Sequence, residues 1–144
     1  MSETQSVKFT KTSPYSITPS KGTPYSVGYD LTAISIFKKV TDRVTLFNTG
    51  IKVVPPKGYY TEILPRSSLS KTGYMLANSV GVIDPDFSDN LLIALIKVDE
   101  NAQDIELPFT RCQLVLRKFE DFQMEEVEEI NDTKRGSFGS TDKN

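Results

Sequence analysis

The chain has 144 residues, of which 38% are hydrophobic and 25% charged, and its formal net charge is −2. This balance is typical of one globular domain with its own core; it gives no basic field for nucleic acid, and no apolar run approaches the roughly 18 residues that span a membrane. The absence of histidine and the presence of one cysteine, Cys112, exclude histidine-dependent nucleophilic catalysis, histidine or thiolate metal sites and an internal disulfide.

These absences restrict the chemistry that an enzyme of this composition can use. Carboxylates, hydroxyls, amides, cationic side chains and a hard, oxygen-bound cation remain, which favours Mg²⁺-assisted phosphate chemistry or a hydrolase with a carboxylate pair. The polar N-terminus lacks the apolar core of a signal peptide, and a single cysteine suits a reducing compartment. We therefore expect an intracellular protein, cytoplasmic or nuclear, without nucleic-acid or membrane partners.

The pattern along the chain predicts an all-β fold. Short apolar or alternating segments are separated by turn residues at close spacing, as in sandwiches and barrels. We expect strands over residues 6–9, 27–31, 44–47, 51–54, 59–64, 75–77, 91–98 and 113–119, and one short helix over 67–71. The acidic segment 120–134 is compatible with a weak helix, an edge strand or an extended arm. The polar, Gly/Ser-rich segment 135–144 is expected to be mobile.

The segment LPRSSLSKTG contains the first candidate site. Pro65 ends a strand, and Arg66 offers a planar fork of donors suited to phosphate. Ser67 and Ser68 are expected to open a helical turn, where free backbone N–H groups and the local dipole attract an anion. The alternative is an N-capped surface turn with a solvated arginine.

The segment NSVGVIDPDF contains the second candidate site. An apolar hairpin arm over 80–83 leads to Asp84, which Pro85 holds in an extended conformation. Gly81 permits close approach by another group. A carboxylate fixed at the end of a buried strand is a candidate general base, and the alternative is an exposed Asp-Pro turn between strands.

Three further segments carry polar residues of interest. Asp30 interrupts the strand-like run SVGYDLTA, where a carboxylate either faces solvent or serves a cation. Gln113 lies in the predicted strand RCQLVL, and the alternative is a partly exposed polar strand residue. The segment RGSFGST combines Arg135, Phe138, two glycines and three hydroxyl residues, and the alternative is a disordered C-terminus.

These five segments, in this order, resemble the five motifs of the trimeric dUTPase family, between about Tyr25 and Thr141. SVGYDLTA is similar to AxGxDLxA, PRSSLS to PRSGLA, and NSVGVIDPDF to the motif centred on GVIDxDY. RCQL is similar to the motif with a fixed glutamine before an apolar strand, and RGSFGST to RGxGGFGST. The third match is the most specific. The sequence also resembles dUTPases of large DNA viruses.

The resemblance implies a fold, an assembly and a reaction. The fold is an all-β, distorted jelly-roll β-barrel of the dUTPase-like β-clip type with one short helix, and it assembles as a homotrimer. Residues 1–134 would form the barrel domain, and residues 135–144 a mobile arm that closes over an active site built from three subunits. The reaction is that of a dUTP diphosphatase, which hydrolyses dUTP to dUMP and pyrophosphate with Mg²⁺ as cofactor.

The resemblance also implies roles for individual residues. Asp84 would orient and deprotonate the water that attacks the α-phosphorus, Asp30 would be linked to the metal through metal-bound water, and Gln113 would position the α-phosphate or the attacking water. Phosphate oxygens would be bound by Arg66, Ser67, Ser68, Arg135, Ser140 and Thr141. Uracil and deoxyribose would be bound by Asn78, Gly81, Val82, Ile83, Phe87 and Phe138, with Phe87 in place of the tyrosine under deoxyribose.

Several positions depart from the family pattern. Ser68 replaces a glycine, and Thr110 takes the place of an arginine, with Arg111 one residue later. Only two residues separate Arg135 from Phe138, two fewer than in the family, which shortens the arm by about 6–7 Å. These departures leave open a catalytically weak or inactive member of the fold that acts as a nucleotide sensor or protein-binding trimer.

Two other functions explain the sequence less well. A deoxycytidine triphosphate deaminase on the related fold needs a different set of acid-base residues, whose motifs do not match here. A jelly-roll structural protein without a ligand leaves the ordered set of five motifs unexplained.

Overall fold

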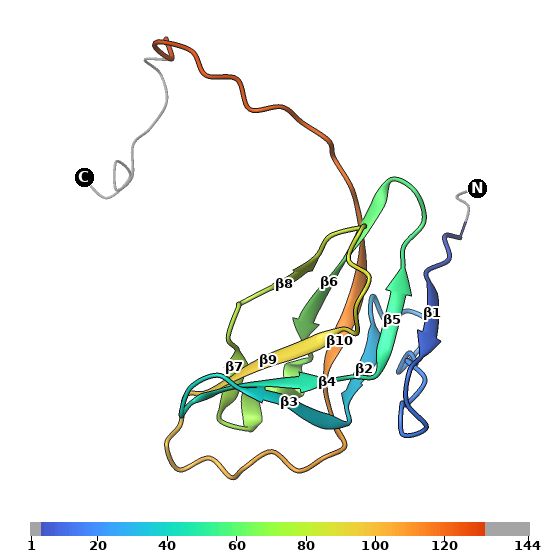
Figure 1. Ribbon diagram of the computed structural model, residues 1–144, viewed down its shortest axis with the longest axis vertical. Coiled ribbons are helices and arrows are strands. Elements are labelled where there is room, and N and C mark those ends of the chain that lie inside the picture. The colour runs from blue at the N-terminus through green and yellow to red at the C-terminus, as the bar shows by residue number, and fades with distance from the viewer. Residues whose placement is uncertain (1–3, 132–144) are drawn as a thin grey trace.

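The computed structural model describes residues 4–131. This part of the chain forms ten strands and one short 3₁₀ helix (Figure 1). The strands are β1 (Lys8–Lys11), β2 (Tyr29–Ala33), β3 (Ser35–Lys39), β4 (Val44–Asn48), β5 (Ile51–Val54), β6 (Tyr59–Pro65), β7 (Tyr74–Leu76), β8 (Gly81–Ile83), β9 (Leu92–Lys97) and β10 (Phe109–Lys118). The helix is η1 (Ser67–Lys71). No helix in this part of the chain is long and apolar enough to cross a membrane.

The strands form two four-stranded antiparallel sheets and a two-stranded ribbon. One sheet has the order β2-β10-β6-β8, the other has the order β3-β4-β9-β7, and the ribbon pairs β1 with β5. Many neighbours in the sheets are distant in sequence, so the chain passes repeatedly from one sheet to the other, as in jelly-roll architectures. In Figure 1 the two-stranded β1-β5 sheet lies along one side of the barrel, and the chain beyond β10 runs away from the barrel.

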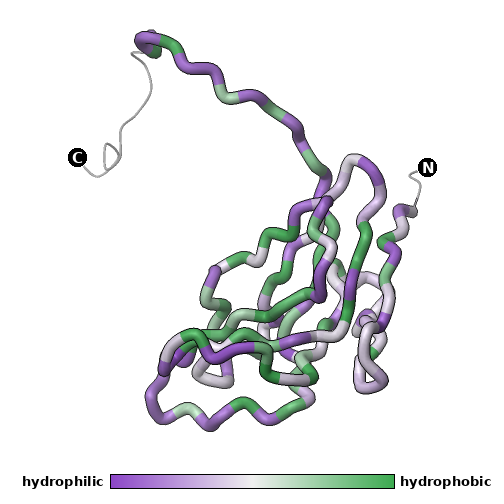
Figure 2. The backbone as a smooth tube through the Cα atoms, viewed as in Figure 1, coloured by the Kyte–Doolittle hydropathy of each residue, from purple (hydrophilic) through white to green (hydrophobic). Residues whose placement is uncertain are grey.

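The core lies between the sheets and is built by alternation along the strands. Successive side chains of a strand point to opposite faces, so residues two apart share the core. Leu91, Ile93 and Leu95 follow this spacing and are at most 1% exposed. Figure 2 shows these hydrophobic stretches running along the strands. Burial of each such side chain contributes roughly 1.5–3 kcal/mol of hydrophobic free energy. The packed core therefore holds the strands in place, and with them the polar residues at the strand ends.

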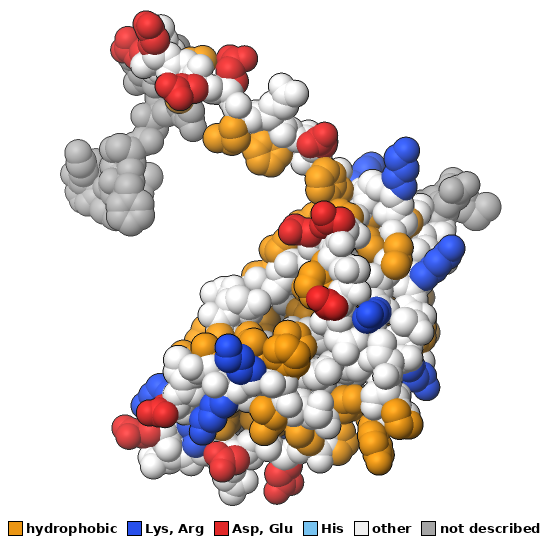
Figure 3. Space-filling model, in the orientation of Figure 1, with side chains coloured by type: hydrophobic (Ala, Val, Ile, Leu, Met, Phe, Trp, Pro, Cys, Tyr) orange, Lys and Arg blue, Asp and Glu red, His pale blue; other side chains and the backbone are white. Residues whose placement is uncertain are grey.

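The all-β prediction is confirmed, with corrections at several elements. The strand at 51–54 and the helix at 67–71 have the predicted bounds, whereas β10 begins at Phe109, four residues before its predicted start. β3 was not expected, because all five of its residues are exposed and its sequence shows no alternation. Residues 119–131 form neither helix nor strand, so the described part of the 120–134 segment is an extended arm, and residues 132–134 lie outside the described residues. Figure 3 shows the acidic side chains of this segment standing clear of the barrel.

Candidate active site

Adjacent strands of one sheet bring three of the predicted site residues together. Asp30 on β2 lies opposite Gln113 on β10, and on the other side of β10 Gln113 lies opposite Leu64 of β6. Arg66 follows β6 directly. Asp30, Arg66 and Gln113 therefore lie at the same end of the β2-β10-β6 sheet, although they are up to 83 residues apart in the sequence (113 − 30 = 83).

The Arg66 guanidinium is held by two groups on these strands. Its Nε lies 3.3 Å from Asp30 Oδ1, and its Nη1 donates to Thr110 O at 3.2 Å. The Arg66 side chain is 39% exposed and that of Asp30 is 21% exposed. Arg66 is thus fixed in orientation while part of its fork still faces solvent, which suits the binding of a phosphate oxygen. The solvated-arginine alternative is wrong.

The Gln113 amide has a defined orientation. Its Nε2 donates to Pro65 O at 3.0 Å, and because a carbonyl can only accept, the amide nitrogen must face Pro65. The Oε1 atom then faces Gly28, where an added β-carbon would lie only 2.5 Å away. Gly28 was assigned no role from the sequence, although it is the glycine of the first motif. Its missing side chain gives the Gln113 amide the space that it occupies.

Residues 66–71 form the turn that was predicted to bind phosphate. The helix η1 begins at Ser67, and no side chain caps its first residues, so the N-capped alternative is wrong. Ser67 is exposed, and Ser70 Oγ donates to Ser67 O at 2.7 Å. The Ser68 hydroxyl is buried and has no hydrogen-bond partner within the described residues. The turn therefore presents Ser67 outward beside Arg66.

The second candidate segment is a turn that leads from β7 in one sheet to β8 in the other, so the predicted hairpin arm is wrong; β8 pairs with β6 instead. Gly81 of β8 lies opposite Ile63, and a β-carbon added at Gly81 would lie 3.2 Å from the Ile63 β-carbon. The group that approaches Gly81 is therefore the chain's own neighbouring strand. In the turn before β8, Ser79 has a positive φ of 62°, and Val80 N donates to Asn78 O at 2.6 Å. The backbone of 78–80 thus forms a tight turn, and Gly81 and Val82 are paired with β6.

Asp84 follows β8 on an exposed turn. Phe87 N donates to Asp84 O at 3.0 Å, which closes the turn, and the Phe87 ring is 39% exposed. The prediction that Asp84 ends a buried strand is wrong, because Val82 is 57% exposed and Asp84 is itself exposed. Residues 85–88 border a groove of about 410 Å³ against the β1-β5 ribbon.

One chain does not place Asp84 beside the arginine. Ile83 lies opposite Thr61, so Asp84 lies near the start of β6, whereas Arg66 follows its end. Six residues of strand separate the two positions by about 20 Å, at roughly 3.3 Å per residue. Within residues 4–131, no hydrogen bond or ion pair joins Asp84 to the Asp30–Arg66–Gln113 cluster. The four predicted residues Arg135, Phe138, Ser140 and Thr141 lie outside the described residues.

The cluster offers one carboxylate for a metal. No group of three or more acidic or cysteine side chains within residues 4–131 could hold an ion. A single carboxylate suits Mg²⁺, which keeps several waters and takes further oxygen ligands from a substrate's phosphates, and does not suit a cation that needs a complete protein cage. The Asp30 side chain is partly exposed, so its carboxylate can serve as the single protein ligand or bind a metal-bound water.

Comparison with known proteins identifies the family of this chain. A family model described as dUTPase matches residues 14–142. The chain belongs to the dUTPase family. It is 38% identical over 129 residues to the deoxyuridine 5'-triphosphate nucleotidohydrolase of Finegoldia magna, covering 85% of this chain and 90% of the relative. The protein of that name from Candida albicans is 32% identical over 148 residues, covering 100% of this chain and 92% of the relative.

Solved structures share the dUTPase fold. A mutant dUTPase of Staphylococcus bacteriophage 80alpha, solved with dUpNHpp, has a TM-score of 0.79 at 20% identity and covers 96% of this chain and 99% of that one. A mutant dUTPase of S. aureus phage phi11, described with a structural Mg(II) ion, has a TM-score of 0.70 at 17% identity and covers 88% of this chain and 99% of that one. The predicted family and fold class are confirmed.

Proposed function

We propose that this protein is a dUTP diphosphatase that hydrolyses dUTP to dUMP and pyrophosphate. Membership of the dUTPase family supports this reaction. The observation that carries the proposal is the fixed Arg66 fork, which Asp30 and Thr110 orient beside the exposed Ser67. Such an arrangement is preorganised to bind a highly charged triphosphate, whose negative charge must be offset before a nucleophile can approach.

The catalytic unit is a homotrimer in which chains share each active site. The separation of about 20 Å between Asp84 and Arg66 along β6 prevents one chain from placing both at one α-phosphate. Asp84 of one subunit is therefore expected to face the Asp30–Arg66–Gln113 cluster of another. The exposure of Asp84 in the single chain supports this arrangement, because a site between subunits needs its carboxylate at the surface.

The residues of the cluster have distinct roles in the reaction. Arg66 and Ser67 bind phosphate oxygens through their side chains, and Ser68, whose hydroxyl is buried, does so through its backbone N–H. Gln113 positions the α-phosphate or the attacking water. Asp84 accepts the proton of that water as it attacks the α-phosphorus. Mg²⁺, when bound, neutralises triphosphate charge, and Asp30 holds it through a metal-bound water.

The turn before β8, together with β8, provides the nucleoside selectivity. The rigid backbone of 78–83 reads the uracil edge with Asn78, Gly81, Val82 and Ile83, and it leaves no room for the methyl group of thymine. Cytosine presents a donor where uracil presents an acceptor, so backbone groups would be left unpaired with it. Phe87 packs beneath deoxyribose and excludes a ribose hydroxyl. Its partial exposure supports a contact with a ligand.

The C-terminal residues complete the site. We assign residues 1–134 to the barrel domain and 135–144 to a mobile arm that closes over bound nucleotide. In this arm Phe138 stacks on uracil, and Arg135, Ser140 and Thr141 contact phosphates. The extended course of residues 119–131 away from the barrel supports an arm that reaches another subunit's site (Figure 1). The reaction is placed inside the cell, and the free thiol of Cys112 is compatible with that location.

Pyrophosphate release from purified protein tests the proposal. With Mg²⁺ we expect turnover of dUTP and far slower turnover of dTTP, dCTP and UTP at equal concentrations. Chelation of the metal should slow dUTP turnover, and adding Mg²⁺ back should restore it. No turnover above background at saturating dUTP and Mg²⁺ would overturn the diphosphatase proposal.

A further inference from the structure

An irregularity in β10 lies directly behind the phosphate-binding turn. Phe109 lies opposite Ala33 of β2, but Cys112 lies opposite Leu31, so β10 uses one residue more than β2 over this interval. Such a bulge bends the strand and re-aims the side chains within it, and bulges are frequent beside active sites. The two residues within the irregular interval are Thr110 and Arg111.

Both of these residues bind the turn that carries Arg66. Thr110 O accepts the hydrogen bond from Arg66 Nη1 at 3.2 Å. Arg111 makes two contacts: its O accepts from Arg66 N at 2.9 Å, and its Nη1 donates to Ser68 O at 3.3 Å. Arg111 therefore binds the turn on both sides of Ser67, once through its backbone and once through its side chain.

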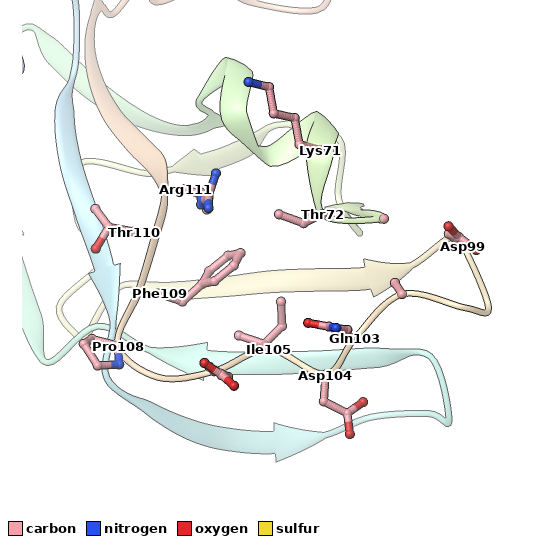
Figure 4. Close-up of a pocket in the computed structure, with 13 residues that line it drawn as sticks. Lys71, Thr72, Asp99, Gln103, Asp104, Ile105, Pro108, Phe109, Thr110 and Arg111 are labelled. Carbon is pink, nitrogen blue, oxygen red and sulfur yellow. The ribbon is translucent and has the colours of Figure 1, made fainter.

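The Arg111 and Arg66 side chains contact different groups. Figure 4 shows it beneath the helix that carries Lys71, above Phe109, at a pocket of about 570 Å³. Arg66 instead points to Asp30. The two arginines thus lie on different sides of the turn, and only Arg66 belongs to the cluster that faces the phosphate.

External contacts are well placed to stabilise the turn, because its internal backbone hydrogen bonds are of the short 3₁₀ type. A five-residue 3₁₀ helix has poor internal hydrogen-bond geometry, and η1 has no side-chain cap at its first residues. A hydrogen bond from a charged guanidinium is stronger than one between neutral groups, so the bond to Ser68 O is well suited to fix the turn.

We propose that Arg111 is a positioning residue for phosphate binding, which acts through Ser68 and Arg66 and does not touch the substrate. The inference rests on the proposed function of the Arg66–Ser68 turn. It also accounts for the departure at position 110: within the bulge the cation lies one residue later, at Arg111, and its side chain contacts the turn through Ser68 O.

Binding of nucleotide and nucleoside separates this role from a general loss of structure. In the Arg111→Met variant we expect the dissociation constant for dUMP and the KM for dUTP to rise roughly tenfold, the scale of one charge-assisted hydrogen bond. The dissociation constant for deoxyuridine, which lacks phosphate, should stay unchanged. Arg111→Lys keeps the charge and a donor and should recover part of the loss.

Arg117→Met is the matched control on the same strand. Arg117 Nε lies 3.5 Å from Glu62 Oε1, and Arg117 lies opposite Tyr60, at the other end of the strand from the turn. Its loss should leave the dUMP and deoxyuridine dissociation constants unchanged. Equal loss of dUMP and deoxyuridine affinity in Arg111→Met, unchanged dUMP affinity, or a lysine variant no better than the methionine variant would each overturn the inference. A wild-type protein that binds dUMP but does not release pyrophosphate from dUTP would count against the proposed function and leave this test intact.

Discussion

Arg66 Nε lies 3.3 Å from Asp30 Oδ1, so a residue after β6 is paired with a residue on β2, across the intervening strand β10. The pair gives Asp30 a second role beside the one proposed for it at the metal. The Asp30 carboxylate holds the Arg66 guanidinium in one orientation, in which the Arg66 side chain remains 39% exposed. Because both side chains keep some exposure, the pair contributes more to geometry than to stability.

Replacing Asp30 with asparagine should therefore weaken phosphate binding even without metal. We expect Asp30→Asn to lower kcat/KM for dUTP by about 10- to 100-fold, as for a residue that orients a ligand-binding group. The free energy of unfolding should change by less than about 1 kcal/mol, since the pair is partly exposed. The decisive measurement is the dUMP dissociation constant in EDTA, where a metal-linked role alone predicts no change.

The same variant can be examined in a double-mutant cycle with Arg66→Met. If Asp30 acts through Arg66, the loss of metal-free dUMP affinity in the double variant should be close to that of Arg66→Met alone. Asp42→Asn, in the exposed turn between β3 and β4, is the matched control. Additive losses would show that the two residues act independently.

Sharing of the active site predicts complementation between inactive chains. Asp84→Asn should bind nucleotide without turnover, and Arg66→Met should also lack turnover. If each site takes Arg66 from one subunit and Asp84 from another, random assembly of equal amounts should restore about a quarter of the sites. The measurement is dUTP turnover after the two variants are unfolded and refolded together. No recovery in mixed trimers would place both residues in one chain's site.

The fold was predictable where burial follows the alternation of the sequence. β5 and β6 combine such alternation with clear turn signals, and both were placed within one residue. β3 carries exposed Ile36 and Phe37 beside two lysines, so no buried face marks it as a strand. Its pairing with β4 is set by tertiary contacts that local sequence does not encode.

The site was predictable as a set of residue types and not as an arrangement. The motifs identified Asp30, Arg66 and Gln113, but their contacts depend on which strands become neighbours, and β2, β10 and β6 are far apart in sequence. The support of Gln113 by Gly28 comes from space that a missing side chain leaves. Neither this space nor the bulge that aims Arg111 has a sequence pattern of its own.

The buried thiol makes stability depend on pH in the alkaline range. Burial raises the pKa of Cys112 from 9.0 to about 12. Below pH 9 the Cys112 thiol keeps its proton in both the folded and the unfolded chain, so its ionisation does not lower the free energy of unfolding. Between pH 9 and 12 the unfolded chain loses the proton while the folded chain retains it, so the free energy of unfolding falls.

Comparison with Cys112→Ala isolates this effect from other groups that titrate at high pH. Between pH 8 and 11, wild type should lose more unfolding free energy than the variant. Native wild type should also resist alkylation at pH 8, since the thiolate is the reactive form and Cys112 is fully buried, and it should react once unfolded. Equal pH dependence in the two proteins, or rapid alkylation of the native state, would contradict the assignment.

Removal of residues 135–144 should lower dUTP turnover without dissociating the trimer. The barrel core lies within residues 4–131, and the truncation removes none of it, so light scattering should report the same mass per assembly apart from the lost residues. Turnover should fall because the open site admits water and loses the Phe138 and Arg135 contacts. Deleting only residues 142–144 is the matched control and should leave kinetics close to wild type. Unchanged turnover after the longer deletion would show that the shortened arm does not act as a lid, and a monomeric product would show that it contributes to assembly instead.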